Sequence, residues 1–429
     1  MSGRYYLETL GCPKNQVDSE KLAGLLAAEG YAPSASVADA DLVVVNTCAF
    51  IEAARQESID TVLALASERR SGSRLVVTGC LAERYGEELS AALPEVDLVA
   101  GFGVPITLGP APRRPSFDLL ELPRPPSGSP WAYLKVAEGC DRTCGFCAIP
   151  SFRGPQRSRT FDALAAEVEA LGDSVQELVL VAQDLASWGL DRTASRHGRC
   201  LTPSTGDNRP VVELVRRLAA MVRRVRLLYL YPSSLDEVLI EAVVDSGVPY
   251  FDLSLQHVSR PHLRRMRRWG DGERFLGRIA DIRRLAPEAA LRSSFILGYP
   301  GESEGDHDEL LAFLAEAQLD WAGFFSFSEE AGTHAAAAPE ADRVPHELAM
   351  ERLRECAEIQ DAITAERRAA LVGSRLEVMV DSPGQGRSYR EAPEIDGVVY
   401  LPDTLVPGTF HVLQVTGAAA SDLWAEPAS

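Results

Sequence analysis

The sequence lacks any segment typical of a membrane-spanning or exported protein. No apolar run approaches the roughly 18 residues that are needed to span a bilayer. The opening residues, MSGRYYLETLGC, contain no basic stretch followed by an apolar one, so no signal peptide is predicted. Internal repeats and low-complexity tracts are also absent. These absences predict a globular protein of the cytoplasm that makes no contact with a membrane.

Positive charge is also scarce over most of the chain. The 43 basic residues stand against 62 acidic ones, which gives a net charge of −19. This balance disfavours binding to nucleic acid or anionic membranes and favours a basic protein partner. The segment 260–285 is an exception, because nine arginines there stand against three acidic residues. The simplest interpretation is that these arginines cover the solvent face of one helix and its flanks.

The alternation of strand and helix patterns predicts three folded units. Short β-rich runs alternate with helical stretches over the first hundred residues, as in a parallel α/β sheet. Six further strand candidates follow from Trp131 onward; a closed β/α barrel has eight, so an open or partial barrel is expected. After one long predicted helix, His346–Leu371, short alternating strands indicate a small β-barrel. The predicted strands are 5–10, 41–46, 74–79 and 96–101; then 131–138, 177–184, 224–232, 250–257, 291–300 and 321–328; then 375–381, 397–402 and 409–417.

These patterns also suggest where the units begin and end. We expect an amino-terminal α/β domain at 1–108 and a barrel domain at 128–366. Residues 109–127 are rich in proline and are interpreted as a linker between them. The small β-barrel is expected at 367–429.

Eight cysteines in a chain without an export signal favour metal binding or catalysis over disulfides. Cys12, Cys48 and Cys80 are far apart in sequence, but each follows a predicted strand by one or two residues. The carboxyl ends of parallel strands lie along one edge of a sheet, so the three thiols can converge. Such a triad can hold zinc or an iron–sulfur cluster, and the triad alone does not decide between them. Burial as small apolar residues is the alternative.

A second triad, Cys140, Cys144 and Cys147, has the spacing C-x3-C-x2-C directly after the predicted strand 131–138. One loop with this spacing can hold a compact iron–sulfur cluster and leave one iron with an open coordination position. An open position is useful where a small chelating molecule must bind. A structural zinc site would need a fourth protein ligand, and the nearby aspartates are weak candidates.

This motif, with Phe146 before its last cysteine, resembles the signature of radical S-adenosylmethionine (SAM) enzymes. The resemblance implies a partial (β/α)6 barrel around a 4Fe–4S cluster that Cys140, Cys144 and Cys147 hold. SAM would bind the open iron and be cleaved there to a radical that abstracts hydrogen from an unactivated carbon.

The three-unit organisation further resembles the methylthiotransferases within this family. That resemblance implies a second, auxiliary 4Fe–4S cluster on Cys12, Cys48 and Cys80, and a TRAM-like terminal β-barrel. Within the family, several segments are similar to the RimO branch. They are LGCPKNQVDSE, NTCAFIEAARQESID, LLYLYPSSL, LSLQHVS, ILGYPGE and EAPEIDGVVYL.

Similarity to the RimO branch implies a specific reaction and specific partners. SAM would serve as methyl donor and as radical source, and a methylthio group would be added to the β-carbon of an aspartate in ribosomal protein S-twelve. The partners would be that protein, free or in the small ribosomal subunit, and an external electron donor. A tRNA substrate is disfavoured, because the tRNA-modifying MiaB branch typically has a CQMN-like sequence at the first cysteine.

The charge of the terminal unit supports a protein substrate independently of these motifs. Residues 371–429 contain three arginines, no lysine and eight acidic residues, a net charge of −5. A barrel that grips RNA phosphates should be basic, whereas an acidic one suits a basic ribosomal protein. The positive charge of 260–285 is evidence against this interpretation, because its arginines would be able to contact ribosomal RNA. The alternatives that remain are a tRNA adenosine methylthiotransferase and a non-catalytic iron–sulfur redox sensor.

The same resemblance suggests residues that bind SAM or the substrate. Gly298, Gly301 and Glu302 end a predicted strand in ILGYPGE and are similar to the family segment that flanks SAM. The glycines would let the backbone approach the cofactor, and a plain strand-to-helix turn is the alternative. Gln183 and Asp184 end another predicted strand and would reach the cofactor or the substrate.

Basic residues and further cysteines complete the list of candidates. Arg153, Arg157 and Arg159 follow the second cysteine motif and are candidates for binding the SAM carboxylate or the substrate aspartate. Cys200 and Cys356 fit no ligand spacing. Cys200 is interpreted as incidental within an enlarged loop, and Cys356 as a packing residue of the long helix.

Overall fold

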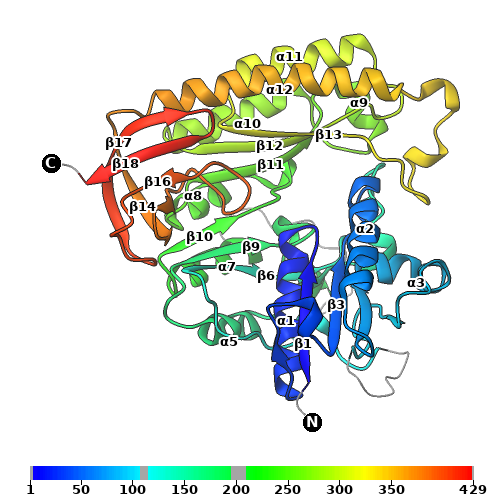
Figure 1. Cartoon of the computed structure of the whole chain (residues 1–429). Coiled ribbons are helices and arrows are strands. Elements are labelled where there is room, and N and C mark those ends of the chain that lie inside the picture. The colour runs from blue at the N-terminus through cyan, green and yellow to red at the C-terminus, as the bar shows by residue number, and fades with distance from the viewer. Residues whose placement is uncertain (1–2, 107–114, 195–208, 428–429) are drawn as a thin grey trace.

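The computed structural model describes residues 3–106, 115–194 and 209–427. An α/β sheet, an open six-stranded barrel and a closed β-barrel follow one another along the chain. The amino-terminal sheet lies beside the barrel, and the long helix α12 (His346–Ala369) runs along the barrel to the terminal unit (Figure 1). The fold class expected from the sequence is therefore confirmed.

The amino-terminal unit is a parallel sheet with the strand order β2-β1-β3-β4-β5. Helices cover both of its faces, because Val43 and Val45 pack against α2 and α3, whereas Leu42 and Val44 pack against α1. The edge strand β2 was not predicted, since its two residues are exposed and one of them is a proline. The elements are β1 (Arg4–Thr9), α1 (Pro13–Ala28), β2 (Ala32–Pro33), β3 (Leu42–Thr47), α2 (Glu52–Glu68), β4 (Arg74–Gly79), α3 (Cys80–Ala92) and β5 (Leu98–Val99).

The central unit is an open barrel of six parallel strands. They form two sheets, β10-β9-β6 and β11-β12-β13, which a parallel bridge between Leu230 and Leu253 connects. All six strands occur where the sequence predicts them. They are β6 (Trp131–Lys135), β9 (Glu177–Val181), β10 (Arg224–Leu227), β11 (Tyr250–Gln256), β12 (Ala290–Leu297) and β13 (Trp321–Ser326).

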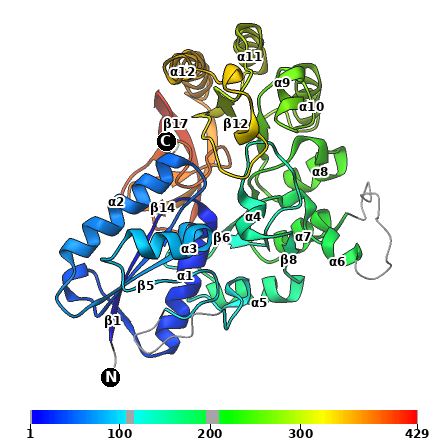
Figure 2. The ribbon, with the colours of Figure 1, turned by 90° about the vertical axis from the view of Figure 1, so that its right-hand side faces the viewer.

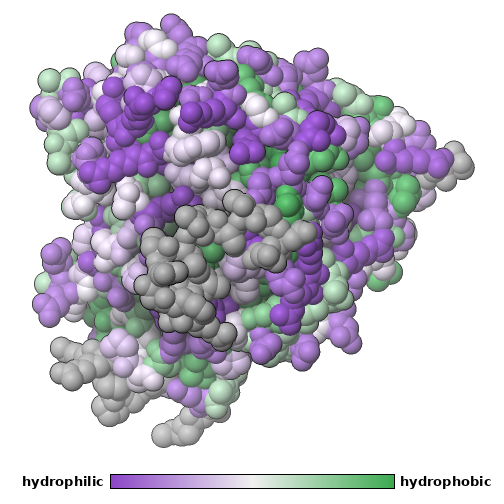
Figure 3. Space-filling model, turned by 180° about the vertical axis from the view of Figure 1, so that it is seen from behind, coloured by the Kyte–Doolittle hydropathy of each residue, from purple (hydrophilic) through white to green (hydrophobic). Residues whose placement is uncertain are grey.

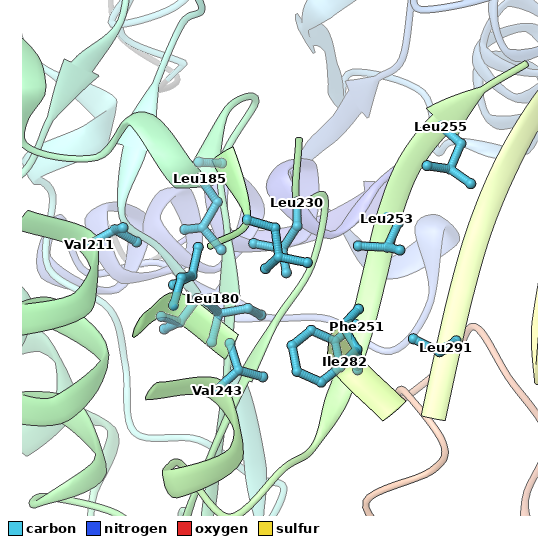
Figure 4. Close-up of a cluster of buried hydrophobic side chains, with 14 of the residues drawn as sticks. Leu180, Leu185, Val211, Leu230, Val243, Phe251, Leu253, Leu255, Ile282 and Leu291 are labelled. Carbon is cyan, nitrogen blue, oxygen red and sulfur yellow. The ribbon is translucent and has the colours of Figure 1, made fainter. Parts of the chain in front are cut away.

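An outer arc of helices covers the barrel on the side away from the amino-terminal sheet (Figure 2). Alternate strand residues such as Leu180, Leu253 and Leu291 point outward and pack against Val243 and Ile282 of these helices (Figure 4). Each such buried side chain contributes about 1.5–3 kcal/mol of hydrophobic stabilisation. The helices are α5 (Phe161–Leu171), α7 (Pro210–Ala219), α8 (Glu237–Asp245), α9 (Arg260–Arg265), α10 (Gly272–Leu285) and α11 (Glu304–Ala317).

Both flanking units contribute to the interior of the barrel. The inward-facing side chains Tyr133, Val179 and Tyr250 form one apolar cluster with Val17 of α1 and Ala392 of the terminal unit. The barrel is therefore filled by residues from all three units, and its interior depends on their relative position.

The terminal unit is a closed barrel with the strand order β14-β15-β16-β18-β17. Three of its strands were predicted; β15 is only three residues long and β18 ends in a proline, and neither was recognised. The strands are β14 (Arg375–Ser382), β15 (Gln385–Arg387), β16 (Val399–Tyr400), β17 (Phe410–Ala419) and β18 (Asp422–Pro427).

Two segments have local structure that the sequence did not predict. The arginine-rich segment 260–285 forms two helices, α9 and α10, rather than one. Most of its arginines are exposed, as expected, whereas Arg268 and Arg283 are partly buried and donate to backbone carbonyls. In the described part of the proline-rich segment, Leu120 and Arg124 are buried. Arg124 donates to the carbonyl of Tyr133 and pairs with Glu167 and Glu20.

The surface agrees with a chain of high polar content. The face opposite to that of Figure 1 is mostly hydrophilic, with hydrophobic residues in small separate groups (Figure 3). Among the described residues, no helix is both long and apolar enough to cross a membrane.

Candidate active site

The first three cysteines lie at the carboxyl ends of neighbouring strands. Cys12 is the N-cap residue of α1, Cys48 follows β3 directly, and Cys80 is the first residue of α3 after β4. Asn15 joins two of these strand ends, because its side-chain amide donates to the carbonyl of Leu10 at 2.9 Å and to that of Thr47 at 3.0 Å. The three cysteine-bearing loops are thus held along one edge of the sheet.

The three thiols lie close enough together to influence the pKa values of one another. Burial raises the pKa of the Cys48 thiol to about 12, and the nearby Cys80 and Cys12 thiolates raise it further, although a backbone N–H acts against this. Burial also acts to raise the pKa of Cys12, but the charges of Lys14 and Arg153 outweigh it and lower that pKa. Binding a metal centre to thiols with raised pKa values releases protons.

The second triad lies in the loop between β7 (Ala137–Glu138) and α4 (Ile149–Arg153). Two backbone hydrogen bonds shape the loop, from Cys140 to the carbonyl of Gly154 at 3.1 Å and from Gly145 to that of Met266 at 2.8 Å. Burial raises the pKa of Cys140 to about 11. Across the part of the chain that the structure describes, no three His, Cys, Asp or Glu side chains close around a single metal-ion position.

Arg153 connects the first triad to the short strand that precedes the second. Its Nη2 atom donates to the Cys80 sulfur at 2.9 Å and to Asn15 Oδ1 at 2.8 Å. Its Nη1 atom donates to Glu138 Oε1 at 2.8 Å, two residues before the second triad begins. The sequence singled out Arg153 as a ligand for a carboxylate of cofactor or substrate, but the structure shows its guanidinium occupied by groups of the protein itself.

Two further arginines lie at the second triad. The Nη1 atom of Arg268 is 3.5 Å from the Cys144 sulfur, and its guanidinium lies 4.0 Å from the centroid of the Tyr231 ring. The guanidinium of Arg142 lies 3.7 Å from the same centroid, and its Nε atom donates to Asp184 at 2.6 Å. Sequence reasoning missed both residues. Arg142 lies within the cysteine motif and was recognisable from its position, whereas the contact of Arg268 spans 124 residues and leaves no local signal.

The predicted strand-end residues also border the second triad. Gln183 donates from Nε2 to Glu138 at 2.9 Å, while its buried Oε1 atom has no partner among the described residues. Asp184 accepts from Ser187 at 2.7 Å as well as from Arg142. A cavity of about 310 Å³ lies beside them, lined by Asp141, Arg142, Gln156, Asp184, Ser187, Leu190 and Asp191.

The ILGYPGE segment forms a tight turn whose contacts are within the protein. The backbone of Gly298 donates to Glu302, and a side chain at Gly298 would come within 2.6 Å of Ala349 in α12. Gly298 and Gly301 both have a φ of 79°, which favours glycine. The carbonyl of Gly301 accepts from Arg265. The proposed role of this segment in SAM binding stays a prediction.

The remaining candidates lie away from the thiols. Arg157 is about half exposed and pairs with Asp118 at 2.6 Å, and Arg159 forms a buried pair with Glu167, also at 2.6 Å. Cys356 is fully buried in the apolar core of the barrel, as a packing residue should be. Cys200 and most of the enlarged loop lie outside the described residues.

Three family models match consecutive parts of the chain. They are the uncharacterized protein family UPF0004 over residues 4–101, the radical SAM superfamily over residues 134–314 and the TRAM domain over residues 372–427.

Curated relatives match almost the whole length of the chain. The ribosomal protein uS12 methylthiotransferase RimO of Moorella thermoacetica is 43% identical, and the match covers 92% of this chain and 91% of the relative. RimO of Desulforudis audaxviator is 42% identical, with 98% and 96% covered. The chain belongs to the RimO family of methylthiotransferases. Among solved structures, the radical SAM methyltransferase TsrM from Kitasatospora setae shares the fold of this RimO family member, with a TM-score of 0.52 at 14% identity over 95% of this chain and 84% of that one.

The donor groups of this RimO family member fit iron–sulfur clusters and SAM. Each triad offers three thiols, and cysteine thiolates are the usual ligands of such clusters. Next to the second triad, Gln183 Oε1 is a buried acceptor and Arg268 Nε a buried donor, both without partners among the described residues. An unsatisfied acceptor and donor suit the amino and carboxylate groups of an amino acid cofactor such as SAM.

Proposed function

We propose that this protein adds a methylthio group to the β-carbon of an aspartate in ribosomal protein uS12 by radical SAM chemistry. The observation that carries the proposal is that one buried guanidinium, Arg153, contacts Cys80 of the first triad and Glu138 at the edge of the second. Two sulfur-rich centres held this close match the need of a reaction that activates a carbon at one centre and supplies sulfur from the other.

The cysteines are the proposed ligands of two 4Fe–4S clusters. Cys140, Cys144 and Cys147 would hold the cluster that binds SAM, and Cys12, Cys48 and Cys80 the auxiliary cluster. When bound, the clusters and SAM supply the electron, the hydrogen-abstracting chemistry, the sulfur and the methyl group that the reaction needs.

The other residues of the site bind and orient. Arg268, beside Cys144, is the proposed partner of the SAM carboxylate, and Gln183 is the proposed acceptor for its amino group. Arg142 and Arg268 both lie against Tyr231, which fixes the two guanidinium planes beside the loop. Arg153 is proposed to hold Cys80 of the first triad in a fixed position relative to Glu138, which precedes the second triad. The apolar layer between strands and helices excludes water from the outer side of the barrel.

The proposed partners are inferred from the net charge of the chain and from the family to which it belongs. The proposed substrate is uS12, free or within the small ribosomal subunit, because the net charge of −19 complements a basic protein. An external electron donor in the cytoplasm is also proposed. A tRNA substrate is the competing proposal, and no contact described above favours it.

The proposal is tested by supplying both substrates to the anaerobically reconstituted full-length enzyme. We expect about eight irons per chain, four for each cluster. A peptide that carries the uS12 aspartate should gain the mass of one methylthio group when SAM and a reductant are present, and tRNA should not. Cys140→Ala and Cys12→Ala should each abolish this gain, whereas Cys356→Ala is the matched control outside both triads. Modification of tRNA alone would contradict the proposal, as would a fully loaded enzyme that leaves SAM intact.

A further inference from the structure

Lysine is rare in this chain. Of the 43 basic residues, three are lysines: Lys14, Lys21 and Lys135. Lys21 is buried and binds Glu167 at 3.2 Å, and Lys135 is buried and binds Asp18 at 2.6 Å. These two ammonium groups neutralise carboxylates of the protein. Lys14 differs from both of them.

Among the residues that the structure describes, the ammonium of Lys14 is paired with no carboxylate, although its charge acts on the neighbouring Cys12 thiol. Lys14 is the second residue of α1, two positions after Cys12, and its Nζ atom lies 3.8 Å from the centroid of the Tyr229 ring. Among the described residues, no carboxylate lies within ion-pair distance of it. The neighbouring cations are already occupied, because Arg153 binds Glu138 and Arg292 binds Asp252 at 3.2 Å.

The barrel holds the aromatic side of this contact in an unusual conformation. Tyr229 comes two residues after β10 and has a φ of 64°, a left-handed value that costs about 1–3 kcal/mol for a residue other than glycine. Its backbone N–H donates to Asp252 at 3.0 Å, which holds the turn in place. Backbone strain of this kind is concentrated at functional sites. Tyr229 therefore places its ring against Lys14 at the boundary between the two domains.

From this geometry we propose that the Lys14 ammonium binds the side-chain carboxylate of the substrate aspartate and selects aspartate over its neutral amide. The proposal rests on the proposed function. The carboxylate of aspartate is bonded directly to the β-carbon, so a cation beside Cys12 holds the reacting carbon next to the auxiliary site. The Tyr229 ring keeps the ammonium in position without neutralising it, which leaves its charge available to a ligand.

The competing explanation is that Lys14 only compensates the negative charge of a metal centre on Cys12. The two explanations predict different results for a pair of peptides. If Lys14 only compensates charge, replacing it changes cluster loading and changes the affinities for the aspartate and asparagine peptides equally. If Lys14 binds the carboxylate, replacing it lowers the affinity for the aspartate peptide alone.

The experiment measures the affinity of the reconstituted full-length enzyme for two peptides that differ only in the target residue, aspartate or asparagine. A charge-assisted contact predicts that the wild-type enzyme binds the aspartate peptide about 10- to 100-fold more tightly. Lys14→Met should abolish this preference while the affinity for the asparagine peptide stays unchanged, with both affinities measured on protein whose iron content has been determined. Lys14→Arg should retain a preference. Arg223→Gln is the matched control, because Arg223 also lies over an aromatic ring, that of Phe410, but at the terminal barrel.

Three results would overturn the role of Lys14. The first is a Lys14→Met enzyme that keeps the full preference for aspartate, and the second is a wild-type enzyme that has no preference. The third is a Lys14→Met enzyme that loses iron and binds both peptides equally more weakly, which is the result expected for charge compensation. Turnover of the peptide by the wild-type enzyme is measured separately. If the wild-type enzyme modifies the peptide while any of these results is found, the proposed function stands and only the proposed role of Lys14 is rejected.

Discussion

At the scale of single residues, Arg153 is the side chain that connects the first cysteine triad to the strand before the second. It is buried and contacts the Cys80 sulfur, Asn15, Glu138 and Asp18. Burial acts to lower the pKa of its guanidinium, but the negative groups around it outweigh burial and raise it well above its ordinary value. A permanent positive charge is therefore fixed between the two sites.

Replacing Arg153 tests this role. Arg153→Met should lower the free energy of unfolding by about 3–5 kcal/mol, because it leaves buried carboxylates with one cation fewer. It should also lower the iron content of the reconstituted protein, since Cys80 loses its donor. Arg153→Lys should recover part of the free energy of unfolding and part of the iron content, because an ammonium keeps the charge but cannot donate in two directions as the guanidinium does.

The measurements are urea-induced unfolding and iron analysis of the full-length chain. Arg157→Met is the matched control; this exposed arginine of the same segment should cost less than about 1 kcal/mol. Equal effects of the two substitutions would contradict a special role for Arg153.

The sequence identified the cysteines but not this connection between them. Spacing and position after a strand are local properties, so both triads could be predicted. The contact between Arg153 and Cys80 joins residues 73 positions apart, and it depends on how the sheet packs against the barrel. No local pattern encodes that distance.

At the scale of elements, the junction of β4 and α3 determines where Cys80 lies. Gly79 ends the strand with φ 90° and ψ −161°, a conformation that only glycine adopts readily. A Cβ atom there would come within 2.2 Å of Asn46 Oδ1 and 2.6 Å of the carbonyl of Thr47. The next residue is Cys80, so any shift of the junction moves a candidate ligand.

Gly79→Ala should therefore impair the auxiliary site more than the second triad. We expect the strained backbone to cost about 1–3 kcal/mol, with the steric overlap adding to it. The iron content should fall by one cluster while SAM cleavage by the other cluster remains. Gly86→Ala is the matched control, because Gly86 lies within α3 with open space around it and should gain about 0.5–1 kcal/mol.

Iron analysis and thermal unfolding of both variants provide the comparison. If Gly79→Ala retained full iron content and stability, the junction would not fix the position of Cys80.

The elements themselves were largely predictable where the hydrophobic pattern was long enough. Local composition predicted all six barrel strands and the strands β1, β3, β4 and β5 of the first unit. β2 and β15 were not predicted because neither lies in a run of β-branched or aromatic residues, and their pairing comes from the neighbouring strand. The equally short β5 and β16 were predicted because the segments around them, 96–101 and 397–402, are rich in valine. The division of 260–285 into two helices also depends on contacts made elsewhere, such as the donation from Gly145 to Met266 at their junction.

At the scale of the whole molecule, buried ion pairs attach the terminal unit to the barrel. Glu177 of β9 accepts from Arg226 of β10 at 2.7 Å and from Arg387 of β15 at 3.2 Å. Arg224 donates to the carbonyl of Glu377 in β14 at 3.1 Å. Glu177, Arg226 and Arg387 are all buried, so their charges depend on one another for compensation.

This arrangement predicts how stability depends on pH. Burial acts to raise the pKa of Glu177, but Arg226, Arg387 and Arg224 outweigh it and lower that pKa from 4.5 to about 2. Because the folded-state pKa lies below the unfolded value, the stabilisation is complete above pH 4.5 and is lost as the pH falls toward about 2. Glu177→Gln should remove this dependence and cost about 3–5 kcal/mol at neutral pH, since two buried arginines lose their partner.

Urea-induced unfolding of the full-length chain, repeated from about pH 6 down to about pH 3, measures this effect. Glu237→Gln is the matched control, because Glu237 forms an exposed pair with Arg284 that should contribute less than about 1 kcal/mol. We expect the wild-type and Glu237→Gln proteins to lose stability in parallel on acidification, while the Glu177→Gln protein starts lower and changes less. An unchanged slope in Glu177→Gln would mean that other carboxylates, and not the ion pairs between barrel and terminal unit, cause the acid sensitivity of the molecule.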